Sequence, residues 1–148
     1  MPAPIDLSQL VAAVADAVVV TDASGAIALW NAAAERMFGF AASEALGQSL
    51  DLIIPERLRN RHWEGFHKTM LTGETKYGTD LLRVPAVDKG GRALSIAFTV
   101  ALLHGADGKP AAIAAVIRDE TSRFNEERSL RKRLAELEAR LAERSAAT

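Results

Sequence analysis

The sequence predicts an α+β domain with a five-stranded antiparallel sheet, helices on one face of the sheet, and an amphipathic C-terminal helix after it. A β-branched run at 18–22 reads as a strand, and residues 92–103 alternate apolar and polar with a period of two. Leucines spaced four, three and four residues apart between 130 and 141 predict a helix instead. The order of two strands, several helices and three strands is typical of an antiparallel sheet with its helices gathered on one face. We therefore expect three parts: an N-terminal helical cap at 1–16, the domain at 17–121, and a C-terminal coiled-coil helix at 122–148.

The first half of the chain has a local signal for each element. Asn31 is suited to cap a helix, and Gly39 is suited to end it in the left-handed conformation. The segment Ala23-Ser-Gly25 is a turn that joins two strands into a hairpin. The predicted elements are a short helix at 7–15, strands at 18–22 and 26–30, a helix at 32–38 and a helical turn at 43–47.

The longest helical pattern runs from Pro55, suited to the first helical position, to Gly73, suited to the C-terminal cap. At about 100° per residue one stripe faces the interior. It contains Leu58, His62, Phe66 and Met70. His67 lies further round and is expected to reach water.

His62 is the candidate functional residue, because an imidazole on an apolar wall can bind a metal, haem iron included. The alternative is a core histidine hydrogen-bonded to a backbone carbonyl. The spacing of the helix leaves both interpretations open.

The second half predicts strands at 77–87, broken late by Pro85, at 92–103 and at 111–117. One face of these strands is expected to oppose the helix at 55–73. It forms an apolar wall of Leu82, Leu94, Ile96, Phe98 and Val100. A register slip of one residue would bring Arg83 or Tyr77 to this wall as a hydrogen-bond donor.

The composition excludes several classes of function. The chain has no cysteine, which excludes disulfides, thiolate metal sites, covalent haem attachment and cysteinyl-adduct photochemistry. With 18 basic and 19 acidic residues, no charge field indicates nucleic acid. No segment is apolar enough to cross a membrane, and no export signal is visible, so a cytoplasmic location is expected. No glycine-rich phosphate loop, activated nucleophile or metal-spaced histidine pair indicates an enzyme.

The hairpin Val18–Asn31, the helix up to Gly39 and the closing Ile117–Thr121 resemble the PAS sensory family from about Leu7 to Thr121. The resemblance implies the PAS fold, a homodimer and an output domain or partner protein beyond the C-terminal helix.

A narrower resemblance covers Arg61-His62-Trp63 and the strand that follows, which are similar to haem-binding PAS sensors of the FixL and RcoM types. It implies haem b with His62 as the iron ligand, and Lys68 and Lys76 near the haem propionates. FixL-type sensors bind oxygen through an arginine where this chain has Leu82. An apolar distal wall favours carbon monoxide or nitric oxide, since bound oxygen gains from a donor.

The sequence alone therefore leaves two possible functions, which belong to different classes. The first is a haem-based sensor of a diatomic gas or of redox state that signals through its C-terminal helix. The second is a haem-free PAS module for dimerisation and relay, or for binding a small ligand.

Overall fold

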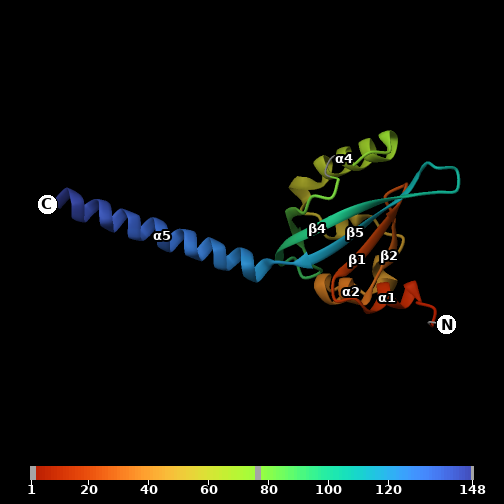
Figure 1. Cartoon of the computed structure of the whole chain (residues 1–148), viewed down its shortest axis with the longest axis horizontal. Helices are drawn as coiled ribbons and strands as arrows, with labels where there is room; N and C mark the ends of the chain where they lie inside the picture. The colour runs from red at the N-terminus through yellow and green to blue at the C-terminus, as the bar shows by residue number, and fades with distance from the viewer. Residues whose placement is uncertain (1–2, 76–77, 148) are drawn as a thin grey trace.

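The computed structural model describes residues 3–75 and 78–147, and its centre is a five-stranded antiparallel sheet in the order β2-β1-β5-β4-β3 (Figure 1). The strands are β1 Ala17–Asp22, β2 Ile27–Trp30, β3 Leu82–Val87, β4 Ala93–His104 and β5 Pro110–Asp119. The predicted fold class is confirmed. The last strand of the chain, β5, takes the central place, so it joins the β1–β2 hairpin to the β3–β4 hairpin.

Helical segments connect β2 to β3 and flank the sheet at both ends of the chain. They are α1 Leu7–Ala13, α2 Ala32–Phe38, α3 Ala42–Ala45, α4 Arg59–Thr72 and α5 Thr121–Ala147, with 3-10 turns η1 Leu50–Leu52 and η2 Glu56–Leu58. The bounds of α2 are those predicted, and Gly39 ends it with φ +80°.

Asn31 is the polar anchor of the N-terminal half. Its Oδ1 accepts hydrogen bonds from the amides of Val18 at 2.9 Å and Ala34 at 3.0 Å. Its Nδ2 donates to the carbonyls of Val11 at 2.8 Å and Asp16 at 3.1 Å. Asn31, which the sequence predicts as the N-terminal cap of α2, therefore also connects α1 and β1 to α2.

The main core lies between α2, the β1–β2 hairpin and the near end of β4. Its buried members include Phe38, Ile27, Leu94 and Ile117. None of the α4 side chains described belongs to this cluster, although Phe66 is buried. Helix α4 therefore contributes little to the central packing of the domain.

The third strand is shorter than predicted, since it begins at Leu82 rather than at residue 77. Gly78, with φ +55°, lies in a turn before it, and positions 76 and 77 lie outside the described residues. Pro85 does not break the strand. It lies opposite Ser95 on the edge strand β3, where a missing backbone N–H is tolerated.

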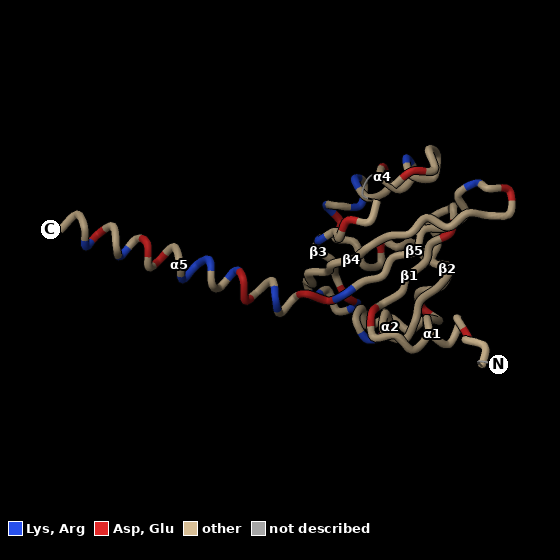
Figure 2. The backbone as a smooth tube through the Cα atoms, in the orientation of Figure 1, with Lys and Arg blue, Asp and Glu red and all other residues tan. Residues whose placement is uncertain are grey.

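Helix α5 leaves the sheet directly after β5 and projects away from the domain (Figure 1). Basic and acidic residues are interspersed along most of its length (Figure 2). No helix in the described ranges is both long and apolar enough to cross a membrane.

Candidate functional site

Helix α4 starts later than the pattern predicts. Pro55 is extended, with φ −54° and ψ 138°, and residues 56–58 form a tighter 3-10 turn closed by a 2.9 Å bond from the Leu58 amide to the Pro55 carbonyl. The α-helix proper begins at Arg59, so the predicted single helix from Pro55 is two elements. Its end is as predicted, with Gly73 at φ +71°.

The inward stripe of α4 agrees with the spacing in the sequence. Phe66 is buried, and Leu58, His62 and Met70 are half-buried. His67 is exposed. The two histidines of this helix thus differ as expected, and only His62 faces the interior.

The His62 ring lies among aromatic neighbours with one nitrogen unpartnered. Its centroid is 4.6 Å from the Trp63 ring, edge-on, and 6.5 Å from the Phe66 ring at an interplanar angle of 25°. Among the described side chains, Nδ1 of His62 is the one buried nitrogen or oxygen without a hydrogen-bond partner. Burial lowers the pKa of the His62 imidazole below its ordinary value, and the nearby Asp51 carboxylate opposes part of this shift. The lowered pKa favours the neutral form of the ring.

This environment bears on the two interpretations of His62. A core histidine satisfied by a backbone carbonyl would show a hydrogen bond at its buried nitrogen, and Nδ1 has none. An unsatisfied buried nitrogen costs about 1–3 kcal/mol. A neutral imidazole with a free ring nitrogen is the form that coordinates metals.

Trp63 fixes the position of α4 over the β1–β2 turn. Its Nε1 donates to Asp51 Oδ1 at 2.7 Å. Its ring lies so close to Gly25 that a Cβ built there would be 2.7 Å from Cζ3 of Trp63. The sequence shows Gly25 only as a turn residue, so this contact could not be anticipated from spacing.

The side chains predicted for the apolar wall lie on one face of the sheet. Leu82 pairs with Phe98 across β3 and β4, which places both side chains on one face of the sheet. Leu94 and Ile96 are buried in this face, while Leu82, Phe98 and Val100 are only half-buried. The part of the face outside the main core is thus apolar and incompletely covered.

The β3–β4 register also decides whether Arg83 can donate a hydrogen bond to the apolar wall. Arg83 lies opposite Ala97 on the other face of the sheet and forms an ion pair with Glu120 at 3.3 Å, so it is no donor to the apolar wall. Lys68 is exposed on α4. Lys76 and Tyr77, the remaining candidates, fall outside the described residues.

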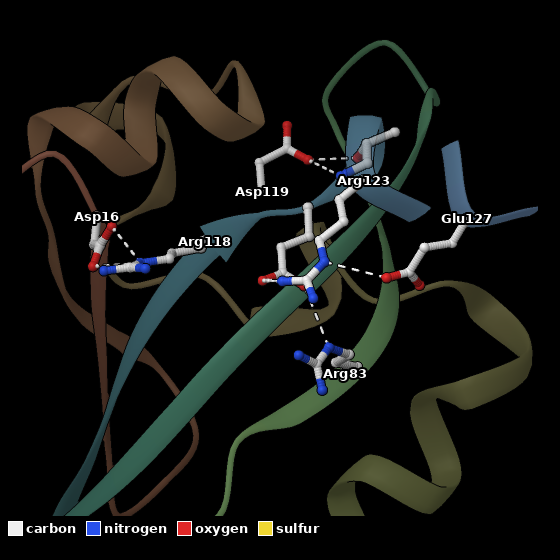
Figure 3. A network of polar contacts seen from close by, with 8 residues as sticks. Asp16, Arg83, Arg118, Asp119, Arg123 and Glu127 are labelled. Atoms are coloured by element: carbon white, nitrogen blue, oxygen red, sulfur yellow. Dashed lines mark hydrogen bonds and ion pairs between the residues drawn. The ribbon is translucent and has the colours of Figure 1, made fainter. Parts of the chain in front are cut away.

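A second polar site joins the sheet to α5 (Figure 3). Asp119 Oδ1 accepts a 2.9 Å bond from the Thr121 amide at the start of the helix, and Thr121 Oγ1 accepts one from the Ser95 amide at 3.0 Å. Glu120 lies between Arg83 and Arg123, whose guanidinium nitrogens are 3.3 and 3.9 Å from its carboxylate. The start of α5 is therefore tied to both β3 and β4.

His62 lines neither of two surface hollows. One, of about 330 Å³, is at the base of α5 beside Arg57, Val84 and Phe124. The other, of about 270 Å³, lies between Ser24, Ser49 and His67. Within residues 3–75 and 78–147, no group of three or more His, Asp or Glu side chains could hold a metal ion.

A five-stranded antiparallel sheet, with helices between its two hairpins and a long helix leaving the central strand, defines a small α+β domain. The chain belongs to the PAS fold family, whose model matches residues 5–120. The predicted family is confirmed.

Two curated relatives cover parts of the chain. An uncharacterised protein of Azorhizobium caulinodans is 34% identical over 116 residues, which are 78% of this chain and 16% of that protein. Sensor protein FixL of Bradyrhizobium diazoefficiens is 41% identical over 56 residues, which are 38% of this chain and 11% of that protein. The chain thus spans less than a fifth of the length of either relative.

Solved structures agree with the fold. The PAS domain of a Colwellia psychrerythraea protein has a TM-score of 0.68 at 21% identity and covers 78% of this chain and 95% of its own. An RNA-binding light-oxygen-voltage receptor has a TM-score of 0.66 at 20% identity, covering 90% of this chain and 37% of its own. At these identities the likeness concerns the fold alone.

Proposed function

We propose that this PAS domain binds haem b through His62 and senses a diatomic gas or a change of redox state. The observation that carries the proposal is the His62 Nδ1 atom, which is buried without a hydrogen-bond partner on a helix face outside the main core. A bound metal would use the lone pair that the protein leaves free. The 41% identity to Sensor protein FixL over 56 residues is consistent with the resemblance to FixL-type sensors on which the proposal also rests.

Each nearby residue has a simple part in holding the group. His62 would be the single protein ligand, since the described chain has no cluster of metal-binding side chains. Phe66 and Met70 on α4 would border one side of the macrocycle, and Leu82, Phe98 and Val100 would border the other. Lys68 is exposed and free to pair with a propionate at the rim. Lys76 remains a second candidate for that role.

The apolar wall bears on which ligand is preferred. Haem iron held by one neutral imidazole can accept a diatomic gas on its open side. Leu82, Leu94, Ile96, Phe98 and Val100 offer no hydrogen-bond donor, and the register keeps Arg83 on the other face. We therefore expect carbon monoxide or nitric oxide to be favoured over oxygen.

The signal would leave through β5 and α5. Strand β5 pairs with β4, which carries Phe98 and Val100 of the proposed site, and it continues into α5 within two residues. The Thr121 amide and hydroxyl bind Asp119 and the Ser95 strand, so movement of β4 or β5 would reorient the helix. We propose that an output domain or partner protein receives this movement, as is common for PAS modules.

A haem-free relay or small-ligand module is the second candidate. The observation in its favour is that the two hollows described above are at the base of α5 and beside His67, and His62 lines neither. In this alternative His62 would be a structural residue with an unsatisfied nitrogen. A non-enzymatic role is proposed in either case.

Titration of the purified chain with haemin separates the two candidates. The haem proposal requires a sharp Soret band at one haem per chain that is lost in His62→Gly and kept in His67→Gly, the matched control on the same helix. Added imidazole should restore the band of His62→Gly, because the free ligand can occupy the space of the lost ring. Under carbon monoxide the reduced protein should give a stable difference spectrum, whereas in air it should lose its ferrous spectrum.

The contrary results are equally clear. No saturable Soret band in the wild-type chain would support the haem-free module. An unchanged band in His62→Gly would remove His62 as the ligand. A ferrous form that persists in air would show that a donor reaches the apolar wall.

A further inference from the structure

The hollow at the base of α5 is separate from the proposed haem site. Of its described lining residues, only Ile96 also belongs to the apolar wall. The lining comes from η2, the edge strand β3, β4 and the start of α5. The volume of about 330 Å³ is at the lower end of the roughly 300–1,000 Å³ that small-molecule sites occupy. The hollow can therefore hold a small organic molecule.

The charged side chains that line this hollow carry one net positive charge. Arg57, Arg83 and Arg123 line it together with Glu120 and Glu127. The Glu120 carboxylate is 3.3 Å from Arg83 and 3.9 Å from Arg123, and the Glu127 carboxylate is 3.2 Å from Arg123 (Figure 3). Both glutamates are thus already paired with an arginine, and the surplus guanidinium is that of Arg57.

Arg57 is held in place while its side chain remains available. Among the residues that the structure describes, its guanidinium has no hydrogen-bond or ion-pair partner. The turn that carries it is closed by a 2.9 Å bond from the Leu58 amide to the Pro55 carbonyl. The nearby Arg59 guanidinium donates to the Ile54 carbonyl at 3.1 Å and so stabilises the same turn. Arg57 therefore offers its donors to an anion from a fixed backbone.

The uncharged part of the lining is mainly apolar. Val84 and Phe124 are 38% and 49% exposed, and Pro85 is exposed on the edge strand. Large apolar side chains left open at a hollow, with a few polar groups beside them, are typical of ligand sites. A ligand with an apolar body would remove these side chains from water.

We propose that the hollow binds a small organic monocarboxylate with an aromatic body. The carboxylate accepts hydrogen bonds from the Arg57 guanidinium, whose planar fork matches two carboxylate oxygens. The aromatic body lies against Val84, Pro85 and Phe124. One negative charge balances the lining, whereas a dicarboxylate or a phosphate monoester would bring a second charge close to the two glutamates.

Such a ligand connects the segment before α4 to the start of α5. Arg57 lies in η2, two residues before α4 begins at Arg59, and Phe124 lies near the beginning of α5. A molecule held by both would restrain α5 against the domain without a movement of the sheet. The ligand is thus a second input to the helix. This inference does not depend on haem binding, because His62 does not line the hollow.

Titration of the isotope-labelled full chain with phenylacetate, followed by the NMR shifts of its backbone amides, tests the proposal. Saturable shifts should centre on Arg57, Val84 and Phe124, with a Kd of about 1 mM or below for so small a ligand. Acetate lacks the aromatic body and phenylacetamide lacks the charge. Each should bind at least about tenfold more weakly than phenylacetate.

Substitution of Arg57 tests the charged contact. Arg57→Gln should raise the Kd of phenylacetate about tenfold, because a charged hydrogen bond is lost. Arg57→Lys keeps the charge but not the planar fork, so it should raise the Kd less. Arg61→Gln makes the same change at an exposed arginine four residues later, outside the lining, and should leave the Kd unchanged.

Substitution of Phe124 tests the apolar contact. Phe124→Ala should raise the Kd of phenylacetate about fivefold, since part of the aromatic body is returned to water. Leu130→Ala removes a 55% exposed leucine of the same helix that does not line the hollow, and it should leave the Kd unchanged. The amide spectrum of each variant also shows whether that variant is folded.

The haem proposal and this one fail separately. His62→Gly should keep the phenylacetate affinity of the wild-type chain, and a chain that binds phenylacetate but no haemin would lose only the haem proposal. The inference is overturned if the wild-type chain shows no saturable shift at any attainable concentration, or if the shifts centre on another part of the domain. Equal Kd values for Arg57→Gln and Arg61→Gln, or loss of binding in His62→Gly, would overturn it as well.

Discussion

Substitution of Gly25 by alanine tests the contact that holds α4 over the β1–β2 turn. Gly25 has φ +90°, and a Cβ there would lie 2.7 and 2.9 Å from Cζ3 and Cη2 of Trp63. No side chain can be accommodated at that distance unless the indole ring moves. Trp63 cannot move freely, because its Nε1 is bonded to Asp51 at 2.7 Å.

The expected loss of stability in Gly25→Ala has two contributions, one from the backbone and one from packing. An L-residue in the left-handed region costs about 1–2 kcal/mol. Overpacking against a fixed ring adds about 1–3 kcal/mol. We therefore expect Gly25→Ala to lower the free energy of unfolding by about 2–5 kcal/mol, measured by urea denaturation followed by circular dichroism.

Two controls separate the parts. Gly47 has φ +83° and open space around its Cα, so Gly47→Ala should show the backbone cost alone. In a Trp63→Phe background the added methyl group of Gly25→Ala meets a smaller ring, and its cost should approach that of Gly47→Ala. Equal costs of Gly25→Ala in both backgrounds would show that Trp63 does not rest on this turn, and the account of how α4 is held would be wrong.

Three further predictions concern other parts of the domain. Asn31→Ala should lower the free energy of unfolding by about 3 kcal/mol, because it removes a helix cap and leaves buried amides and carbonyls unpaired; a loss below about 1 kcal/mol in urea denaturation would contradict the anchor role. The pKa of His62 is lower in the folded chain, so the unfolded chain binds the proton first as the pH falls. The free energy of unfolding of the haem-free protein should therefore decrease as the pH drops below the ordinary histidine value near 6.5. His62→Gln should flatten this pH dependence in urea titrations at several pH values. A steeper slope in that variant would refute the burial of the ring. Arg83→Ala should change stability by less than about 1 kcal/mol, because the Arg83 side chain is 59% exposed; a loss above about 2 kcal/mol would show that the Glu120 cluster acts cooperatively.

Most of the fold could be predicted because its signals are local. The α2 helix has a capping asparagine before it and a glycine after it, and both act through the adjacent backbone. The alternation in β4 places Leu94 and Ile96 inside, as observed. The start of β3 was placed too early, because the turn at Gly78, with φ +55°, depends on the backbone conformation there and not on an apolar pattern.

Part of the candidate site could be predicted from the sequence. The helical period separated His62 from His67, since it depends only on the angle between residues. The unpartnered state of Nδ1 and the Trp63–Gly25 contact depend on segments far apart in the chain, so no spacing indicates them. The choice between Leu82 and Arg83 depends on the β3–β4 register, which the structure fixes through the pairing of Leu82 with Phe98.

The direct passage from β5 into α5 has a mechanical consequence. Asp119 ends the strand and Thr121 begins the helix, so no flexible loop absorbs a change of direction. At 1.5 Å per residue the 27-residue helix is a lever about 40 Å long. A tilt of about 5° at its base would displace the far end by roughly 3.5 Å over that length, about the rise of two helical residues. A shift in the sheet too small to alter its hydrogen bonds can therefore become a displacement at the tip that is large enough to change how neighbouring side chains pack.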